Sequence, residues 1–160
     1  MGNGKFRWVV LVASFLIGLC SCSENPKTEE EDYSPLDPAT LTIGDTIMPF
    51  RYLNPNTHDW RVVVRISGED LVDVSHKLST RMFSTTNDKV LERIRKWKFI
   101  YRRTGVVDAS STVRVFQNDQ LIETYGIVLE KKHVGLQSKK FGVMISVRHD
   151  ELLEILKEMN

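Results

Sequence analysis

Residues 60–66 carry the clearest strand pattern in the chain. In this segment, WRVVVRI, every second residue is large and apolar, whereas Arg61 and Arg65 share the opposite face. Side chains of a strand alternate between its two faces, so this spacing predicts a half-buried strand. A weaker strand pattern covers residues 41–53, and the turn residues 54–56 separate the two.

A second group of alternating segments predicts a hairpin and a further strand. Residues 112–116 and 121–130 alternate on either side of Asn118-Asp119, a residue pair that suits a two-residue turn. Gly126 is a candidate position for a bulge in the second of these strands. Residues 141–147 alternate again and predict another strand.

Three segments instead have helical spacing. Ser67 is a suitable helix cap, and the apolar residues that follow it keep helical spacing as far as Met82. A second helix is predicted to begin near Asn87 and to end near Lys96. Residues 149–159 form an amphipathic closing helix, in which the acidic residues 150 and 151 suit the positive helix end.

The segment 97–103 returns to strand spacing after the second helix. Its aromatic residues Trp97, Phe99 and Tyr101 fall on one face, and Lys98 and Arg102 fall on the other. Neighbouring strands with helices between and after them predict an α+β fold, in which two to three helices pack on an antiparallel sheet. About 120 residues from 41 onward are enough for one such domain, 41–160.

The N-terminus has a different pattern from the rest of the chain. Lys5 and Arg7 precede the uncharged apolar segment 8–19, and small residues and cysteines follow it. A basic start, a short apolar segment and a small-residue processing site are typical of a secretory signal. Twelve helical residues reach about 18 Å, which is too short for the roughly 30 Å of a membrane core.

The processing site adds a second prediction. Leu19-Cys20-Ser21-Cys22 resembles the lipobox of bacterial lipoproteins, in which an aliphatic residue and two small residues precede the cysteine that is modified. The resemblance implies that residues 1–21 form the signal peptide and that Cys22 receives a diacylglyceryl group and becomes the mature N-terminus. Two or three acyl chains would anchor the protein stably in a membrane.

An acidic, proline-containing segment follows Cys22. Residues 23–40 cannot bury apolar surface and predict a solvated linker of up to about 60 Å. The acids at 29–32 resemble the surface-export signal of Bacteroidota-type lipoproteins, although they lie several positions beyond Cys22. We therefore expect a lipid-anchored protein of the outer membrane, exposed at the surface, similar to small envelope lipoproteins of these bacteria.

The sequence contains no recognised set of residues for catalysis or for binding a cofactor or metal. Loss of Cys20 and lipidation of Cys22 would leave no free thiol. The histidines have no metal-binding spacing, and Gly135 and Gly142 flank LQSKKF without the strand-loop-helix context of a phosphate-binding loop. We expect no cofactor and no metal. Carboxylates for glycan hydrolysis would come from Asp108, Glu123 and Glu130, without a spacing that selects two of them.

The strongest charge feature is the basic and aromatic segment 89–103. It contains seven basic residues and one acid, whereas the chain from residue 38 onward has only four more basic than acidic residues. Nucleic acid is therefore not an expected partner. A surface for an acidic protein, an anionic glycan or lipid headgroups is one interpretation, with Arg95, Lys98, Arg102 and Arg103 as its candidate residues. A solvated outer strand face is the other, and the acidic linker is a further candidate to fold back on it.

These observations predict an interaction module and not an enzyme. The alternatives that the sequence leaves open are a small hydrolase of envelope glycans, an immunity or inhibitor lipoprotein, and an accessory subunit of an envelope complex. None of them is selected by a motif.

The lipobox makes a direct prediction about the two cysteines. Cys22→Ala abolishes labelling of the protein by a fatty-acid analogue in growing cells, whereas Cys20→Ala leaves labelling in place, because only the thiol of Cys22 is acylated. Labelling is measured on the immunoprecipitated protein. The reverse result, with loss of label in Cys20→Ala alone, would place the processing site elsewhere.

Overall fold

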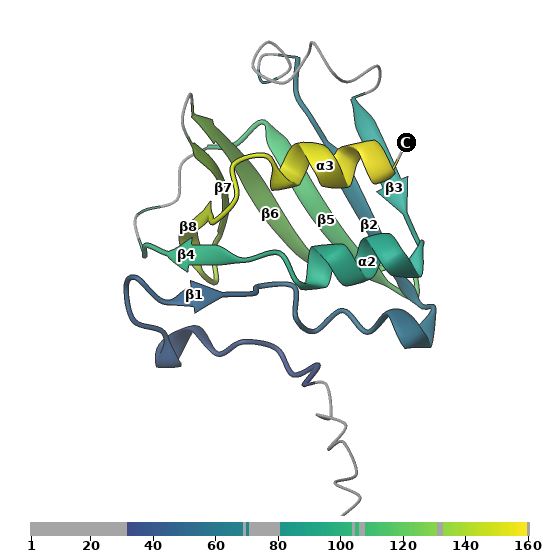
Figure 1. Ribbon diagram of the computed structural model, residues 1–160, viewed down its shortest axis with the longest axis horizontal. Coiled ribbons are helices and arrows are strands. Elements are labelled where there is room, and N and C mark those ends of the chain that lie inside the picture. Colours follow the sequence, from purple (N-terminus) through teal and green to yellow (C-terminus); the bar gives the residue numbers. More distant parts are fainter. Residues whose placement is uncertain are drawn as a thin grey trace, which may run out of the picture. The chain divides into compact units, whose positions relative to one another are not determined.

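One antiparallel sheet dominates the computed structural model, which describes residues 32–68, 70, 81–103, 105, 108–130 and 133–159. The order of its eight strands is β1-β4-β8-β7-β6-β5-β2-β3 (Figure 1). The strands are β1 (Thr46–Ile47), β2 (Trp60–Arg65), β3 (Met82–Thr85), β4 (Phe99–Tyr101), β5 (Ser111–Gln117), β6 (Gln120–Glu130), β7 (His133–Ser138) and β8 (Gly142–Ser146). Two α-helices, α2 (Asp88–Arg95) and α3 (Glu151–Glu158), and two 3₁₀ turns, η1 (Pro38–Thr40) and η2 (Pro55–Thr57), complete the described elements.

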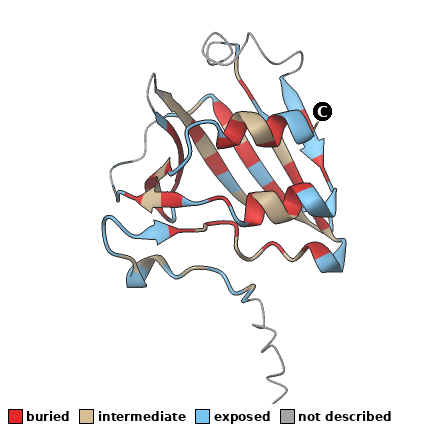
Figure 2. Cartoon of the chain, viewed as in Figure 1, coloured by how far each residue is buried: buried red, intermediate tan, exposed pale blue. Residues whose placement is uncertain are grey.

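The core lies between the sheet and the two helices, which cross in front of β2 and β5 in Figure 1. Every second residue of these strands is buried, and Figure 2 shows the resulting alternation. Helix α2 begins at Asn87, whose side chain accepts a hydrogen bond from the Lys89 amide at 3.0 Å. Its residues Val90, Leu91 and Ile94 are buried against the sheet. Burial of apolar surface is therefore shared by one sheet face and both helices.

Strand β7 is enclosed more completely than the others. Residues 134–138 are all buried, whichever face of the strand they belong to. Gly135 permits this close packing, because a Cβ atom there would lie 2.7 Å from the carbonyl oxygen of Met144 on β8. Strand β4, which lies on the other side of β8, pairs with both β1 and β8, and its residues Phe99 and Tyr101 are buried.

The predicted fold class, α+β with two to three helices packed on a sheet, is wrong. The fold is dominated by its eight-stranded antiparallel sheet, and each described α-helix has only eight residues. The helix predicted from Ser67 falls largely outside the described residues, and Met82, its last apolar position, begins β3 instead. Strand β7 was missed because it has only two large apolar residues, Val134 and Leu136, and its other buried positions are Gly135, Gln137 and Ser138.

Several local predictions are confirmed, and two are wrong in detail. Segment 60–66 is β2, and residues 112–130 form the β5–β6 hairpin, whose turn residues Asn118 and Asp119 both have positive φ. The bulge lies opposite Val115 and Phe116 and not at Gly126. In the closing helix, Asp150 makes no side-chain capping bond and instead pairs with Arg148 at 3.3 Å.

The segment 32–40, predicted as linker, packs on the folded unit. Asp32 forms an ion pair with Arg51 at 2.8 Å, and Arg51 Nε donates to the Ser34 carbonyl at 2.7 Å. Hydrogen bonds from Ser34 and the charge of Arg51 lower the pKa of the Asp32 carboxyl. The compact unit spans Glu31–Asn160. Cys22 lies outside the described residues, and among those described no helix has the length and hydropathy to cross a membrane.

Candidate functional site

A hollow of about 540 Å³ opens where the end of β4 meets the β7–β8 turn and η1. Its volume falls within the range of small-molecule sites in proteins, about 300–1,000 Å³. Three of its lining side chains are cationic: Arg103, Lys139 and Lys140. The others are Pro38, Ala39, Leu41, Tyr101, Gly105, Phe141 and Gly142.

Backbone hydrogen bonds fix the two segments that carry these cations. The Tyr101 amide donates to the Asp45 carbonyl at 2.9 Å, and the Gly44 amide donates to the Tyr101 carbonyl at 2.9 Å, so the end of β4 is held by the preceding loop. Arg103 follows with φ of 48°, a left-handed conformation that is uncommon for a residue with a side chain. The chain therefore turns sharply at the residue whose guanidinium lines the hollow.

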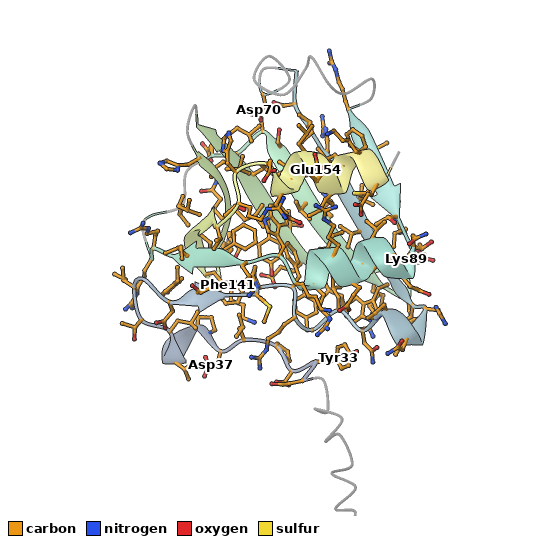
Figure 3. All side chains as sticks on the ribbon, viewed as in Figure 1. Tyr33, Asp37, Asp70, Lys89, Phe141 and Glu154 are labelled. Atoms are coloured by element: carbon orange, nitrogen blue, oxygen red, sulfur yellow. The ribbon has the colours of Figure 1, made fainter. Side chains whose placement is uncertain are left out.

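The β7–β8 turn is fixed by side-chain and aromatic contacts. Ser138 Oγ accepts a hydrogen bond from the Phe141 amide at 3.1 Å, and this bond closes the turn. The ring of Phe141, labelled in Figure 3, is buried, and the ammonium group of Lys140 lies 5.1 Å from its centre. The two lysines are thus presented by a rigid turn.

The charge of the hollow is positive, because none of the described residues that line it is acidic. Within the described part of the chain, neither Arg103 nor Lys139 has an ion-pair partner. Lys140 interacts electrostatically with the half-buried carboxyl of Glu123. Burial raises the pKa of Glu123, and attraction to Lys140 offsets part of that increase. An anionic ligand would therefore find three cations with little internal neutralisation.

The four residues predicted from the basic segment do not form one patch. Arg95 is 8% exposed, and its guanidinium makes two hydrogen bonds to Glu92, at 2.7 and 2.8 Å. These bonds dominate the environment of Glu92 and lower the pKa of its carboxyl to about 2. Arg95 also lies over the ring of Tyr33, 5.2 Å from its centre. Tyr33, in the segment predicted as linker, therefore contacts the basic segment through its ring. The predicted pairing of the linker acids with this segment is not seen for Asp32, which pairs with Arg51, and the acids 29–31 lie outside the described residues.

Lys98 lines a different and smaller hollow of about 270 Å³. Three of the four cations around that hollow are compensated: Arg93 and Arg148 both pair with Glu151, at 2.8 and 2.9 Å, and Lys96 pairs with Glu92 at 2.6 Å. Lys98 itself has no ion-pair partner among the described residues. Arg102 is exposed, and only Arg103 of the predicted residues reaches the larger hollow.

Lys139 and Lys140 were not predicted as site residues. Their segment, LQSKKF, was set aside because it lacks the strand-loop-helix context of a phosphate-binding loop. The structure confirms that this context is absent, since the segment is a turn between two strands. The sequence signal that could have identified this site is the pair of lysines shortly before Gly142. In the structure this glycine has a φ of 67°.

Two of the three carboxylates considered for glycan hydrolysis occupy distant backbone positions. Glu123 and Glu130 lie seven residues apart on β6, a separation of about 23 Å along a strand. Hydrolases place their two carboxyl groups within about 10 Å of each other. Asp108 is exposed and precedes β5. Among the described residues, no three histidine, cysteine, aspartate or glutamate side chains are grouped as a metal site would require.

No protein-family model, curated protein or solved structure matches this chain. The interpretation of the hollow therefore depends on its own geometry and charge.

The different environments of Arg95 and Lys98 predict different effects on stability. Arg95→Ala lowers the free energy of unfolding at pH 7 by about 1–2 kcal/mol, because it removes charge-assisted hydrogen bonds to Glu92. Lys98→Ala changes it by less than about 0.5 kcal/mol. Chemical denaturation measures both values.

The effect of Arg95→Ala should also depend on pH. The lowered pKa of Glu92 stabilises the folded state above the ordinary value of 4.5, and this contribution is lost as the pH falls towards about 2. The difference between wild type and Arg95→Ala should therefore shrink over that range. Equal effects of the two substitutions, or a difference independent of pH, would contradict this assignment.

Proposed function

We propose that this protein is a lipoprotein of a bacterial outer membrane, anchored through Cys22, whose folded domain is a non-enzymatic binding module for an anionic ligand. The lipobox pattern at Leu19-Cys20-Ser21-Cys22 supports the anchoring part of the proposal. The acidic segment that follows supports exposure at the cell surface. Both remain predictions from the sequence.

The hollow at Arg103, Lys139 and Lys140 carries the binding part of the proposal. It combines a volume of about 540 Å³ with three cations, and its described lining contains no acid. Cations that are not needed for internal ion pairs raise the local concentration of anions and favour their binding. The hollow is also preformed, since backbone hydrogen bonds and the β7–β8 turn hold its walls.

The remaining lining residues indicate the kind of anion. Leu41 provides half-buried apolar surface beside the three cations, whereas the rings of Tyr101 and Phe141 are buried behind them. A phosphate or carboxylate group on a carbohydrate would meet the cations through charge-assisted hydrogen bonds, and a hollow of this volume has room for the sugar ring beside them. We therefore propose an anionic saccharide as the ligand class.

The proposal predicts that glucose 1-phosphate binds to the purified protein and that glucose does not. Replacement of Arg103, Lys139 and Lys140 by alanine should weaken this binding by more than tenfold, since each cation contributes a charge-assisted hydrogen bond. Isothermal titration calorimetry at low ionic strength measures the affinity. The matched control replaces Arg65, Lys89 and Lys98, three exposed cations outside the hollow, by alanine and should bind as wild type does.

Equal loss of binding in the control variant would show a general charge effect and would contradict a site at the hollow. The same conclusion would follow if glucose and glucose 1-phosphate gave the same heat. Thermal unfolding of each variant separates loss of the site from loss of the fold.

A further inference from the structure

A second cationic surface lies on the face of the sheet opposite α2 and α3. Residues of β2 and β5 that point away from the core include Arg61, Arg65 and Arg114. Arg65 and Arg114 are exposed, and neither has an ion-pair partner among the residues that the structure describes. We call these three residues the arginine row.

The strand register fixes the spacing of the arginine row. Arg114 pairs with Val63, which lies midway between Arg61 and Arg65 on β2. Strands rise about 3.3 Å per residue and lie about 4.8 Å apart, so neighbouring arginines are about 8 Å apart at their Cα atoms. The charges therefore spread over a flat surface and do not converge on one point, unlike those of the hollow.

Few acids oppose this charge. Strands β2, β3 and β5 contain no acidic residue. Asp119, in the β5–β6 turn, pairs with Arg61 at 2.9 Å, and Arg61 also stacks on the ring of Phe116, 4.3 Å from its centre. Arg61 is therefore partly neutralised and held in place, whereas the charges of Arg65 and Arg114 face solvent.

Exposed apolar side chains flank the arginine row. Met82 pairs with Arg65 across β2 and β3 and is 66% exposed. Leu121 pairs with Phe116 across the hairpin and is 54% exposed, and the adjacent Ile122, in the bulge, is 48% exposed. A flat surface that presents cations between exposed apolar side chains has the composition of proteins that lie on a membrane interface.

We propose that the arginine row and its flanking apolar residues dock on the anionic lipid surface of the membrane in which the protein is anchored. This inference depends on the anchoring part of the proposed function and not on the hollow. Residues 32–40 pack on the folded unit, so only the ten positions from Cys22 to Asp32 separate the anchor from it. This length is at most about 33 Å, and it keeps the sheet face at a high effective concentration near the membrane.

The test places a polarity-sensitive fluorophore on the sheet face of the lipidated full-length protein in vesicles. Ser84→Cys introduces an exposed thiol beside Val63 on this face, and Lys157→Cys introduces one on α3 as the control. With Cys22 acylated, the protein without either substitution takes up no label. Emission is compared between vesicles of phosphatidylcholine alone and vesicles that also contain phosphatidylglycerol.

We expect a blue shift at position 84 and not at position 157, in the anionic vesicles only. Arg65→Glu with Arg114→Glu should abolish it, because each arginine near an anionic surface changes the docked population by about fivefold. Lysine at both positions should retain it, and alanine at the three cations of the hollow should leave it unchanged. Salt at 1 M should also remove it, since the screening length falls to about 3 Å.

Equal emission in both vesicle types, or equal shifts at the two labelled positions, would overturn the proposal. A shift produced by a soluble acidic polysaccharide and not by anionic vesicles would overturn it in favour of a glycan partner. Flotation of the protein with phosphatidylcholine vesicles reports the lipid anchor alone, so failure of the anchor is distinguished from failure of the docking surface.

Discussion

Burial of the aromatic face of the segment 97–101 is the interaction on which the rest of the structure depends. Trp97, Phe99 and Tyr101 are at most 3% exposed. The Trp97 indole donates to Ser146 Oγ at 2.8 Å, and its ring lies 6.1 Å from that of Phe50, which in turn contacts Tyr125 of β6 at 4.8 Å. These contacts join the β1–β4–β8 end of the sheet to the strands under the helices. Truncating large buried aromatic side chains typically costs about 3–5 kcal/mol.

The alternation of buried and exposed residues along the segment 97–103 also positions its basic side chains. Because every second residue from Trp97 onward is buried, Lys98 and Arg102 face outward and the chain leaves the sheet at Arg103. Arg103 then meets the lysines of the β7–β8 turn, which arrive beside it because β8 pairs with β4. The hollow is therefore a consequence of strand order, and its three cations come from segments more than 30 residues apart in the sequence.

Local patterns in the sequence predicted much of the fold, but not its class. Period-two spacing identified β2, the β5–β6 hairpin and the outward position of Lys98, because each of these strands has one buried face. It failed for β7, which has only two large apolar residues, and for β3, where Met82 continues a helical spacing. The sequence analysis therefore lacked strands β3 and β7 and placed a helix over residues up to Met82. These errors led it to an α+β fold in place of a sheet-dominated one.

The site was less predictable than the strands. The run of basic residues contributes to three different environments: a part-buried ion pair at Arg95, a largely compensated hollow at Lys98 and an uncompensated hollow at Arg103. These outcomes differ because burial and pairing depend on Glu92, Glu151 and the β7–β8 turn, none of which the local pattern reveals. Local charge density was therefore a poor guide to the cations left for a ligand.

The two cationic surfaces suggest a division of roles. The arginine row is flat and carries exposed apolar neighbours, which suits a membrane surface, whereas the hollow is concave and suits a small anionic group. Their residues come from different strands, so a substitution in one surface leaves the other unchanged. A protein held close to its membrane by a short linker would then present the hollow to soluble or surface-bound saccharides.

The most direct test of this account is hydrogen exchange of the full-length protein with and without glucose 1-phosphate. The account predicts slower amide exchange in residues 37–41, 101–103 and 139–142, which build the hollow, and unchanged exchange in α2 and α3. Protection centred on α2 and α3, beside the smaller hollow at Lys98, would contradict the assignment of the site. Identical exchange in all segments at a saturating concentration would contradict anion binding by this domain.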